Sequence, residues 1–455
     1  MALGGLMRGR GPVGPDFVHF VRGRDARILT LSMRRVATLV AYCAPYEFED
    51  SIARDAGADQ VELDSLSRLE FLRRVYKVAR LVTRSSARAL RLTPPAGRAV
   101  LSKEYDLFFP VFNNPYELFA LHAIPDWRAR SRFAACFISE IWEQGVPEYL
   151  LELLRSFDRI YLGVTRPIEA VARITGRPVQ YLPLATDTLV FAPYPDPPLR
   201  SIDVCGIGRR SPITHQALIR LARERGLFYY YDTVRTKAGV QNSDRQITFH
   251  VSNPAEHRFL LANLLKRSRY FIANRARANE PEVTRGVEEI AGRFFEGAAA
   301  GAIMLGAPPR TETFRAFFDW PDAVIPVAID APEIGDVISA LEADPARCAR
   351  IRRDGVVNSL LRHDWVHRLR VVFDACGLPP TEGMLAREAR LRAIAQRLAA
   401  GESAGSETPR LSPRVVQRSV LEASEVPGSR DRCGPEREPG LGYSTDEQLK
   451  ARQDL

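Results

Sequence analysis

The sequence predicts an α/β fold made of two Rossmann-like domains that face a cleft. Short apolar, strand-like runs alternate with helix-like runs along most of the chain, which is typical of parallel sheets covered by helices. A stretch with five prolines, residues 181–200, divides this alternation into two series. The chain has 455 residues, of which 45% are hydrophobic, and this suits two domains with separate cores.

The first series lies before the proline-rich stretch. Its strands are predicted at residues 36–42, 60–63, 105–112, 132–138 and 159–162. Its helices are predicted at residues 67–92, 115–122 and 147–156.

The second series follows the proline-rich stretch. Its strands are predicted at residues 202–205, 227–231, 270–273, 302–305 and 323–327. Its helices are predicted at residues 213–225, 254–267, 334–342, 345–361 and 365–376, with a later one at 384–399.

These elements predict a domain organisation with flexible ends. The predicted parts are a poorly ordered extension (1–33), an N-terminal Rossmann-like domain (34–185), a linker (186–200), a C-terminal Rossmann-like domain (201–380), a helical extension (381–400) and a tail (401–455). The tail is rich in Ser, Gly, Pro and charged residues with few aromatics, so we expect it to be disordered. Ligands of such sheets bind beyond the carboxyl ends of the strands.

The composition of the chain indicates its cellular compartment and the class of its binding partners. The six cysteines are scattered without a CxxC pair, which favours a reducing compartment and argues against a structural zinc site. No signal peptide is recognisable and no apolar run reaches the length of a membrane span, so we expect a cytoplasmic protein. The net charge of +9 favours anionic partners: phosphorylated ligands, an acidic membrane surface or nucleic acid.

The sequence GIGRR, residues 206–210, forms a glycine turn between a predicted strand and a predicted helix. Such a turn lets backbone N–H groups approach an anion, and Gly208 gives the close approach. Arg209 and Arg210 can add charged hydrogen bonds to phosphate oxygens. The spacing matches neither GxxxxGK[ST] nor GxGxxG, so an ordinary turn with solvated arginines stays an equal alternative.

The stretch RFFEGAAAGAIMLG, residues 293–306, places one carboxylate at the start of a small-sided apolar helix. Glu296 there is favoured by the helix dipole and can accept hydrogen bonds from ribose hydroxyls. Arg293 precedes it, and Glu288 lies eight positions before it. On composition alone, a helix-start glutamate beside a solvated loop is the more common situation.

This stretch resembles the core motif of group 1 glycosyltransferases of the GT-B fold, especially the branch similar to the spore proteins CgeB and YkvP. Glu288 and Glu296 match the E-x7-E pattern of retaining enzymes, although Glu289 offers a shifted pair. Further matches follow in the expected order over residues 180–378. They are YLPLATDTLVF between the domains, RSIDVCGIGRR at the start of the second domain and RRDGVVNSLLRHDWVHRL at its end.

The resemblance implies a nucleotide-diphosphate sugar as donor and no cofactor or metal ion. Glu296 would bind the ribose, Glu288 would contact the transferred sugar, and Arg293 and Gly208 would lie at the donor. Arg209, Arg210 and Lys266 would neutralise the diphosphate. The family usually has an Arg and a Lys at this position where this chain has two adjacent arginines, and no DxD pair is present for a metal.

The first domain would supply the acceptor side. Glu140 follows a predicted strand in FISEIWEQG and can orient or activate an acceptor hydroxyl, although a solvated loop acid is as common. His122 matches a donor-side histidine only loosely and is more readily structural. The basic amphipathic helix at 67–92 can rest on anionic lipid or cover the core with a solvated face. No RNA- or DNA-binding motif accompanies the charge, so we expect no nucleic-acid partner.

The sequence therefore predicts a glycosyltransferase that moves a sugar to a hydroxyl of a glycan, lipid or protein, with retention at the anomeric carbon. Two alternatives stay open. One is a nucleotide-sugar epimerase with the same two-domain fold, for which no second set of acid and base residues is evident. The other is a catalytically silent module that binds sugar nucleotides or partners in a surface assembly.

Overall fold

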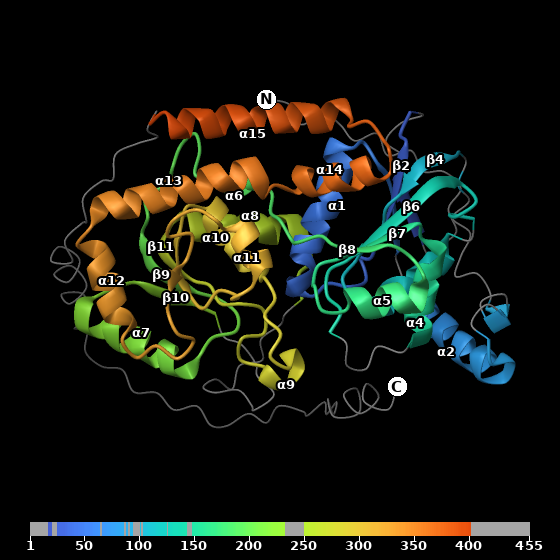
Figure 1. The fold of residues 1–455 in the computed structure, drawn as a ribbon, viewed down its shortest axis with the longest axis horizontal. Coiled ribbons are helices and arrows are strands. Elements are labelled where there is room, and N and C mark those ends of the chain that lie inside the picture. The colour runs from blue at the N-terminus through green and yellow to red at the C-terminus, as the bar shows by residue number, and fades with distance from the viewer. Residues whose placement is uncertain are drawn as a thin grey trace, which may run out of the picture. The chain divides into compact units, whose positions relative to one another are not determined.

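The computed structural model describes residues 17–20, 25–63, 66–85, 88–89, 92–93, 101, 103–124, 126–142, 148–232 and 250–401 (Figure 1). These residues belong to one compact unit. The predicted disordered tail lies outside the described residues from residue 402 onward, and so does most of the predicted N-terminal extension.

The N-terminal sheet has the strand order β1-β3-β2-β4-β6-β7-β8, and β5 pairs with β6. The strands are β1 (Phe17–Phe20), β2 (Ile28–Ser32), β3 (Asp59–Leu63), β4 (Tyr105–Phe108), β5 (Val111–Phe112), β6 (Ser131–Ile138), β7 (Arg159–Leu162) and β8 (Val179–Tyr181). The pairs are parallel except for β1 with β3. The helices of this half are η1 (Val40–Tyr42), α1 (Cys43–Asp55), α2 (Leu66–Thr83), η2 (Pro115–Ala123), α4 (Glu148–Glu152), η3 (Leu153–Ser156) and α5 (Ile168–Thr175).

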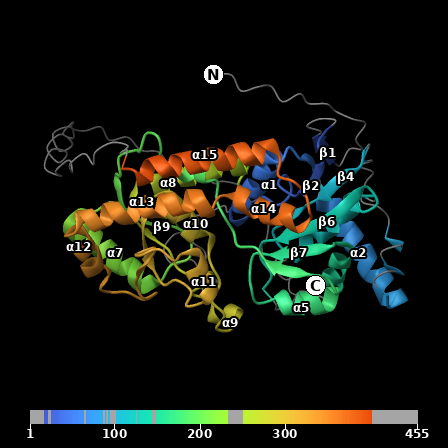
Figure 2. The same cartoon turned by 45° about the horizontal axis from the view of Figure 1, so that its top comes forward.

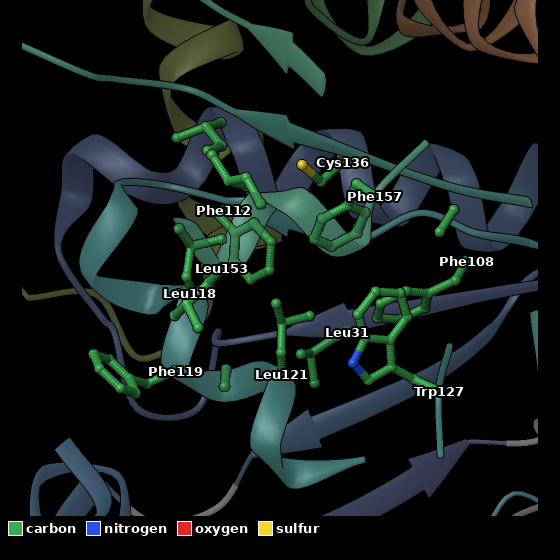
Figure 3. Close-up of a cluster of buried hydrophobic side chains, with 14 of the residues drawn as sticks. Leu31, Phe108, Phe112, Leu118, Phe119, Leu121, Trp127, Cys136, Leu153 and Phe157 are labelled. Atoms are coloured by element: carbon green, nitrogen blue, oxygen red, sulfur yellow. The ribbon is translucent and has the colours of Figure 1, made fainter. Parts of the chain in front are cut away.

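Side chains alternate between the two faces of this sheet, as the two-residue period of a strand requires. On β6, Ala134, Cys136 and Ile138 enter the cluster that Figure 3 shows, where they meet α2, η2 and the helices around residue 150. Ala135 and Phe137 point to the opposite face, which packs against α1 and the C-terminal helices. Both faces are therefore buried, which is the usual state of a parallel sheet.

The C-terminal sheet is parallel throughout, with the order β10-β9-β11-β12-β13. The strands are β9 (Ile202–Gly206), β10 (Tyr229–Tyr231), β11 (Ser268–Ile272), β12 (Ile303–Gly306) and β13 (Ile325–Pro326). The helices are α6 (Thr188–Phe191), α7 (Pro212–Arg225), α8 (Pro254–Lys266), α9 (Pro281–Thr284), α10 (Gly292–Ala299), α11 (Glu312–Phe317), α12 (Ile334–Glu342), α13 (Pro345–Arg362), α14 (Trp365–Ala375) and α15 (Glu382–Ala399). The chain reverses its direction of winding between β9 and β11, and such a switch point is where ligands bind in open α/β sheets.

Local signals explain where several helices of this half begin. Ser211, Asn253 and Asp344 accept hydrogen bonds from the first turns of α7, α8 and α13, and each is followed by a proline. A polar cap with proline at the first helical position is a strong start signal. The α/β prediction with two Rossmann-like domains is confirmed.

The first predicted strand is wrong. Residues 36–42 contain turns and the short helix η1, whose residues are not buried. The buried strand is β2, which lies in the segment predicted to be a poorly ordered extension. A short apolar run has no periodicity that separates a strand from a turn. The Thr and Ser residues of β2 interrupt its apolar run, so the sequence did not indicate a buried strand there. The prediction also omitted α5 and β8, and it extended the helix that begins near residue 67 beyond the end of α2.

Helix α15 joins the two halves of the described chain. In Figures 1 and 2, α15 runs over α13 and reaches toward α1 and α14. Its Arg387 is buried and donates to Asp364 at 2.7 Å and to Asp187 at 2.6 Å. Asp55 of α1 lies 3.6 Å from the same guanidinium. The helix is thus fixed to both halves by charge as well as by packing.

Candidate functional site

A cavity of about 140 Å³ lies between the carboxyl ends of the two sheets. The N-terminal half contributes Ser139, Glu140 and Trp142 after β6, with Gly163 and Val164 after β7. The C-terminal half contributes residues 209–211 after β9, residues 274–279 after β11 and residues 290–293 at the start of α10. Two Rossmann-like domains that share such a pocket make the GT-B arrangement, and the pocket lies at the switch point between β9 and β11.

The predicted glycine turn is part of this pocket. Gly208 has a φ of +73°, a conformation that glycine adopts without strain, and its N–H donates to Asp232 Oδ1 at 2.7 Å. Arg210 donates to the same Asp232 oxygen at 2.9 Å and to the carbonyl of Gly206 at 3.0 Å. Arg209 pairs through Nε with Glu280 at 2.7 Å. The N–H of Gly208 and the side chains of Arg209 and Arg210 were predicted to bind a phosphate. In this structure they bind carboxylates of the chain itself.

Five arginines line the pocket: Arg209, Arg210, Arg275, Arg277 and Arg293. The first two pair with Glu280 and Asp232, as described above. Arg275 pairs with Glu288 at 3.3 Å, and Arg277 pairs with Glu280 at 2.8 Å and with Glu140 at 3.4 Å.

Arg293 differs from the other four arginines. Within the described part of the chain it has no carboxylate within ion-pair distance, and its guanidinium donates to the carbonyl of Arg209 at 3.4 Å. Burial lowers the pKa of Arg293 below its ordinary value. Gly208 makes the room for this side chain, because a Cβ at that position would overlap the guanidinium. Glu296 and Asp232 act on this guanidinium only from beyond ion-pair distance, and a partly buried cation without a directly paired carboxylate attracts an anionic ligand.

The adjacent acids Glu288 and Glu289 have separate roles, and neither lines the pocket. Glu288 accepts from the backbone N–H of Arg310 at 2.6 Å and pairs with Arg275. Glu289 is buried and accepts from Thr165 N at 2.7 Å and from Arg166 N at 3.0 Å, both in the N-terminal half. Burial raises the pKa of Glu289, although these hydrogen bonds act to lower it. Glu289 connects the two halves, and Glu288 supports a pocket arginine.

Glu296, which is predicted to bind the ribose, lies outside the pocket lining. Its carboxylate is buried in the second turn of α10, away from the pocket lining, and it pairs with Arg258 of α8. Arg258 also donates to Glu47 of α1 at 3.0 Å. Although burial opposes its charge, the two carboxylates raise the pKa of Arg258. The motif predicted the start of α10. The partner of Glu296, Arg258 on α8, is distant in the sequence, so no local pattern predicts this ion pair.

Three other residues named from the sequence, Lys266, Glu140 and His122, also have clear positions. Lys266 lies outside the pocket lining and donates to the carbonyl of Val190 at 3.0 Å. Its position at the end of α8 directs it toward α6 rather than toward the glycine turn. Glu140 does line the pocket, with about half of its side chain exposed, and accepts from Trp142 Nε1 at 3.1 Å. His122 is partly buried outside the pocket, and burial lowers its pKa.

Sequence reasoning missed the loop NRARAN, residues 274–279. It supplies Asn274, Arg275 and Arg277 to the pocket directly after β11. The guanidinium of Arg277 lies 4.9 Å from the ring centre of Trp142, so the loop touches the opposite domain. Two arginines at the carboxyl end of a predicted parallel strand are a usable signal, because that edge of the sheet holds ligands.

No group of three or more His, Cys, Asp or Glu side chains suitable for a metal ion occurs among the described residues. Likewise, no helix in the described ranges is long and apolar enough to cross a membrane. The expectation of a metal-independent reaction stays a prediction.

Comparisons with known proteins give one family match and several similar solved structures. The family model described as "Glycosyl transferase-like" matches residues 243–374. Among solved structures, the chain is similar to TarM, with 8% identity over 59% of this chain and 54% of that chain, and a TM-score of 0.36. It is also similar to the glycotransferase of kitacinnamycin, with 12% identity over 78% of this chain and 100% of that chain, and a TM-score of 0.35.

The match to TarM spans about half of that protein's length. A search of curated proteins gives no match. The similarity to the glycosyl transferase-like family thus covers residues 243–374 of a fold with two Rossmann-like sheets.

Proposed function

We propose that this protein transfers a glycosyl group from a nucleotide-diphosphate sugar to a hydroxyl acceptor in the pocket between its domains. The observation that carries the proposal is Arg293, a partly buried guanidinium with no carboxylate within ion-pair distance among the described residues, set against the glycine turn at Gly208. The glycosyl transferase-like match over residues 243–374 supports a sugar donor over other anions.

The arginines of the pocket bind the diphosphate of the donor. As the bond between C1 of the sugar and the phosphate oxygen breaks, negative charge grows on the leaving nucleoside diphosphate. Arg293 and Arg209 then stabilise that charge at fixed positions, which lowers the barrier without reorganisation. Electrostatic stabilisation of the leaving group is thus the main contribution of the C-terminal half.

The N-terminal half positions the acceptor. Glu140 is the carboxylate that lines the pocket within the described ranges, and its hydrogen bond to Trp142 fixes its direction. It orients the acceptor hydroxyl while the new bond between that oxygen and C1 forms. The hydroxyl proton passes to Glu140 or to the departing phosphate oxygen, so the step is balanced in either case. Retention at C1 and the absence of a metal are parts of the proposal that rest on the family resemblance.

Donor binding requires two ion pairs within the protein to break. The cavity of about 140 Å³ is smaller than the roughly 300–1,000 Å³ of typical small-molecule sites. Glu280 and Asp232 now hold Arg209 and Arg210, the cations that the diphosphate needs. The donor therefore displaces these two carboxylates when it enters.

The test is nucleotide binding followed by product formation. Thermal unfolding of the full-length protein is measured with UDP, GDP, ADP and dTDP and their sugars, for wild type and Arg293→Gln. We expect one nucleotide to raise the unfolding temperature of wild type and to bind the variant about 10- to 150-fold more weakly, the range for a charged hydrogen bond. Arg315→Gln, an exposed arginine of α11 outside the pocket, is the matched control.

Three results separate this proposal from its alternatives. Failure of every nucleotide to bind wild type contradicts the donor site. Binding without sugar transfer to any glycan, lipid or protein acceptor supports a silent module. Conversion of one nucleotide sugar into its epimer, without transfer, supports an epimerase.

A further inference from the structure

Helix α2 has two apolar faces, of which one is buried and one is exposed. Leu72 and Tyr76 are buried against the N-terminal core. Phe71, Val78, Leu81 and Val82 have between 58% and 80% of their surface exposed. Phe71, Val78 and Val82 are separated by seven and four residues, which places them on one stripe of the helix. The amphipathic pattern therefore accounts for the inner face but leaves an apolar stripe in water.

Positive charge flanks this stripe. Arg74 on α2 is exposed, and so are Arg84 and Arg88, which follow the end of the helix in the sequence. Between residues 66 and 92 the sequence has eight Arg or Lys residues and a single acid, Glu70. An exposed apolar stripe beside a cationic face is the arrangement of helices that lie in the surface of a membrane.

We propose that α2 docks on an anionic lipid surface, with Phe71, Val78, Leu81 and Val82 inserted among the acyl chains. The positive charge beside this stripe favours a lipid surface over a second copy of the chain as its partner. A second copy of the chain would bring an equally cationic helix against the first, and the repulsion opposes self-association. Lipid phosphate attracts the arginines and the bilayer accepts the apolar side chains, so one partner satisfies both features.

The position of α2 allows this contact. Figures 1 and 2 both show α2 at the border of the N-terminal half, on the side away from the C-terminal sheet. It contributes no residue to the pocket lining. The inference therefore stands independently of the proposed sugar transfer.

The experiment is vesicle sedimentation of the full-length protein. We expect binding to phosphatidylglycerol-containing vesicles, little binding to pure phosphatidylcholine vesicles, and loss of binding at high salt. Leu81→Glu/Val82→Glu should weaken binding by more than about tenfold. Arg74→Glu/Arg84→Glu should weaken it by at least about fivefold for each removed cation.

The matched control is Phe259→Glu/Leu260→Glu, which charges two consecutive exposed apolar residues on α8. It should bind vesicles as wild type does, and circular dichroism should show all variants folded. Absence of wild-type binding to anionic vesicles, or unchanged binding of Leu81→Glu/Val82→Glu, overturns the proposal. A wild-type dimer that this double variant converts to a monomer, without any vesicle binding, overturns it in favour of self-association.

Discussion

Gly208 and Arg293 are in direct contact, so that any side chain at position 208 would overlap the arginine guanidinium. The φ of +73° at Gly208 adds backbone strain for every other residue. The glycine turn and the start of α10 therefore depend on each other, although 85 positions separate them in the sequence.

Gly208→Ala should displace Arg293 and weaken nucleotide binding by at least about tenfold, since a charged hydrogen bond is worth roughly 1.5–3 kcal/mol. The backbone strain alone should cost about 1 kcal/mol of stability. Gly226→Ala is the control, because Gly226 has a similar φ of +65° but no atom within 4 Å of the added Cβ. Equal loss of binding in both variants, measured by calorimetric titration, would show that strain rather than the Arg293 contact is responsible.

Glu280→Gln should strengthen nucleotide binding. Glu280 holds both Arg209 and Arg277, and these arginines lower its pKa despite its partial burial. Removal of its charge frees the cations for the diphosphate, and a partly exposed pair worth up to about 1 kcal/mol corresponds to up to about fivefold in affinity. Glu312→Gln, which removes an exposed carboxylate of α11, should leave the affinity unchanged. Weaker binding to Glu280→Gln would mean that Glu280 itself contacts the donor.

Arg258→Met should destabilise the fold strongly. The change leaves Glu47 and Glu296 buried without their cation, and the loss of one partner in a buried pair costs about 3–5 kcal/mol. Arg347→Met removes a partly exposed pair with Asp322 and should cost less than about 1 kcal/mol. Urea unfolding measures both. If Arg258→Met keeps its stability and instead weakens donor binding, the network belongs to the site after all.

Stability should depend on pH through Glu117. Burial raises the pKa of Glu117 to about 7, against the hydrogen bonds from Asn113. The folded state therefore binds this proton more tightly than the unfolded state, and stability falls as pH rises from about 4.5 to about 7. Glu117→Gln mimics the protonated acid and should remove a loss on the order of 3 kcal/mol across this window. Denaturant midpoints at several pH values test this, and an unchanged pH slope in the variant would contradict it.

Sequence reasoning located the helices better than the ion pairs. Capped starts such as Ser211-Pro212 are local, so the helices they begin could be predicted within a few residues. The short apolar run at 36–42 had no such signal, and tertiary structure placed the buried strand at β2 instead. Local patterns thus predicted the two-domain fold but not all of its strands.

The candidate site was predictable to the extent that its residues follow strands. Gly208, Arg209, Arg210 and Glu140 follow strands and line the pocket or its glycine turn. Glu296 and Lys266 took partners from elements distant in the chain, Arg258 and Val190, which no local pattern reveals. A motif shows which element a residue begins, whereas the fold decides what its side chain meets.

The packing of α15 has a consequence for synthesis of the protein. One face of the N-terminal sheet, including Leu107 and Phe137, is covered by side chains of α14 and α15 such as Trp365 and Leu391. A nascent chain must therefore carry this uncovered apolar face until α14 and α15 leave the ribosome. The first half made is the last to be completed, and it requires protection from aggregation while the second half is translated.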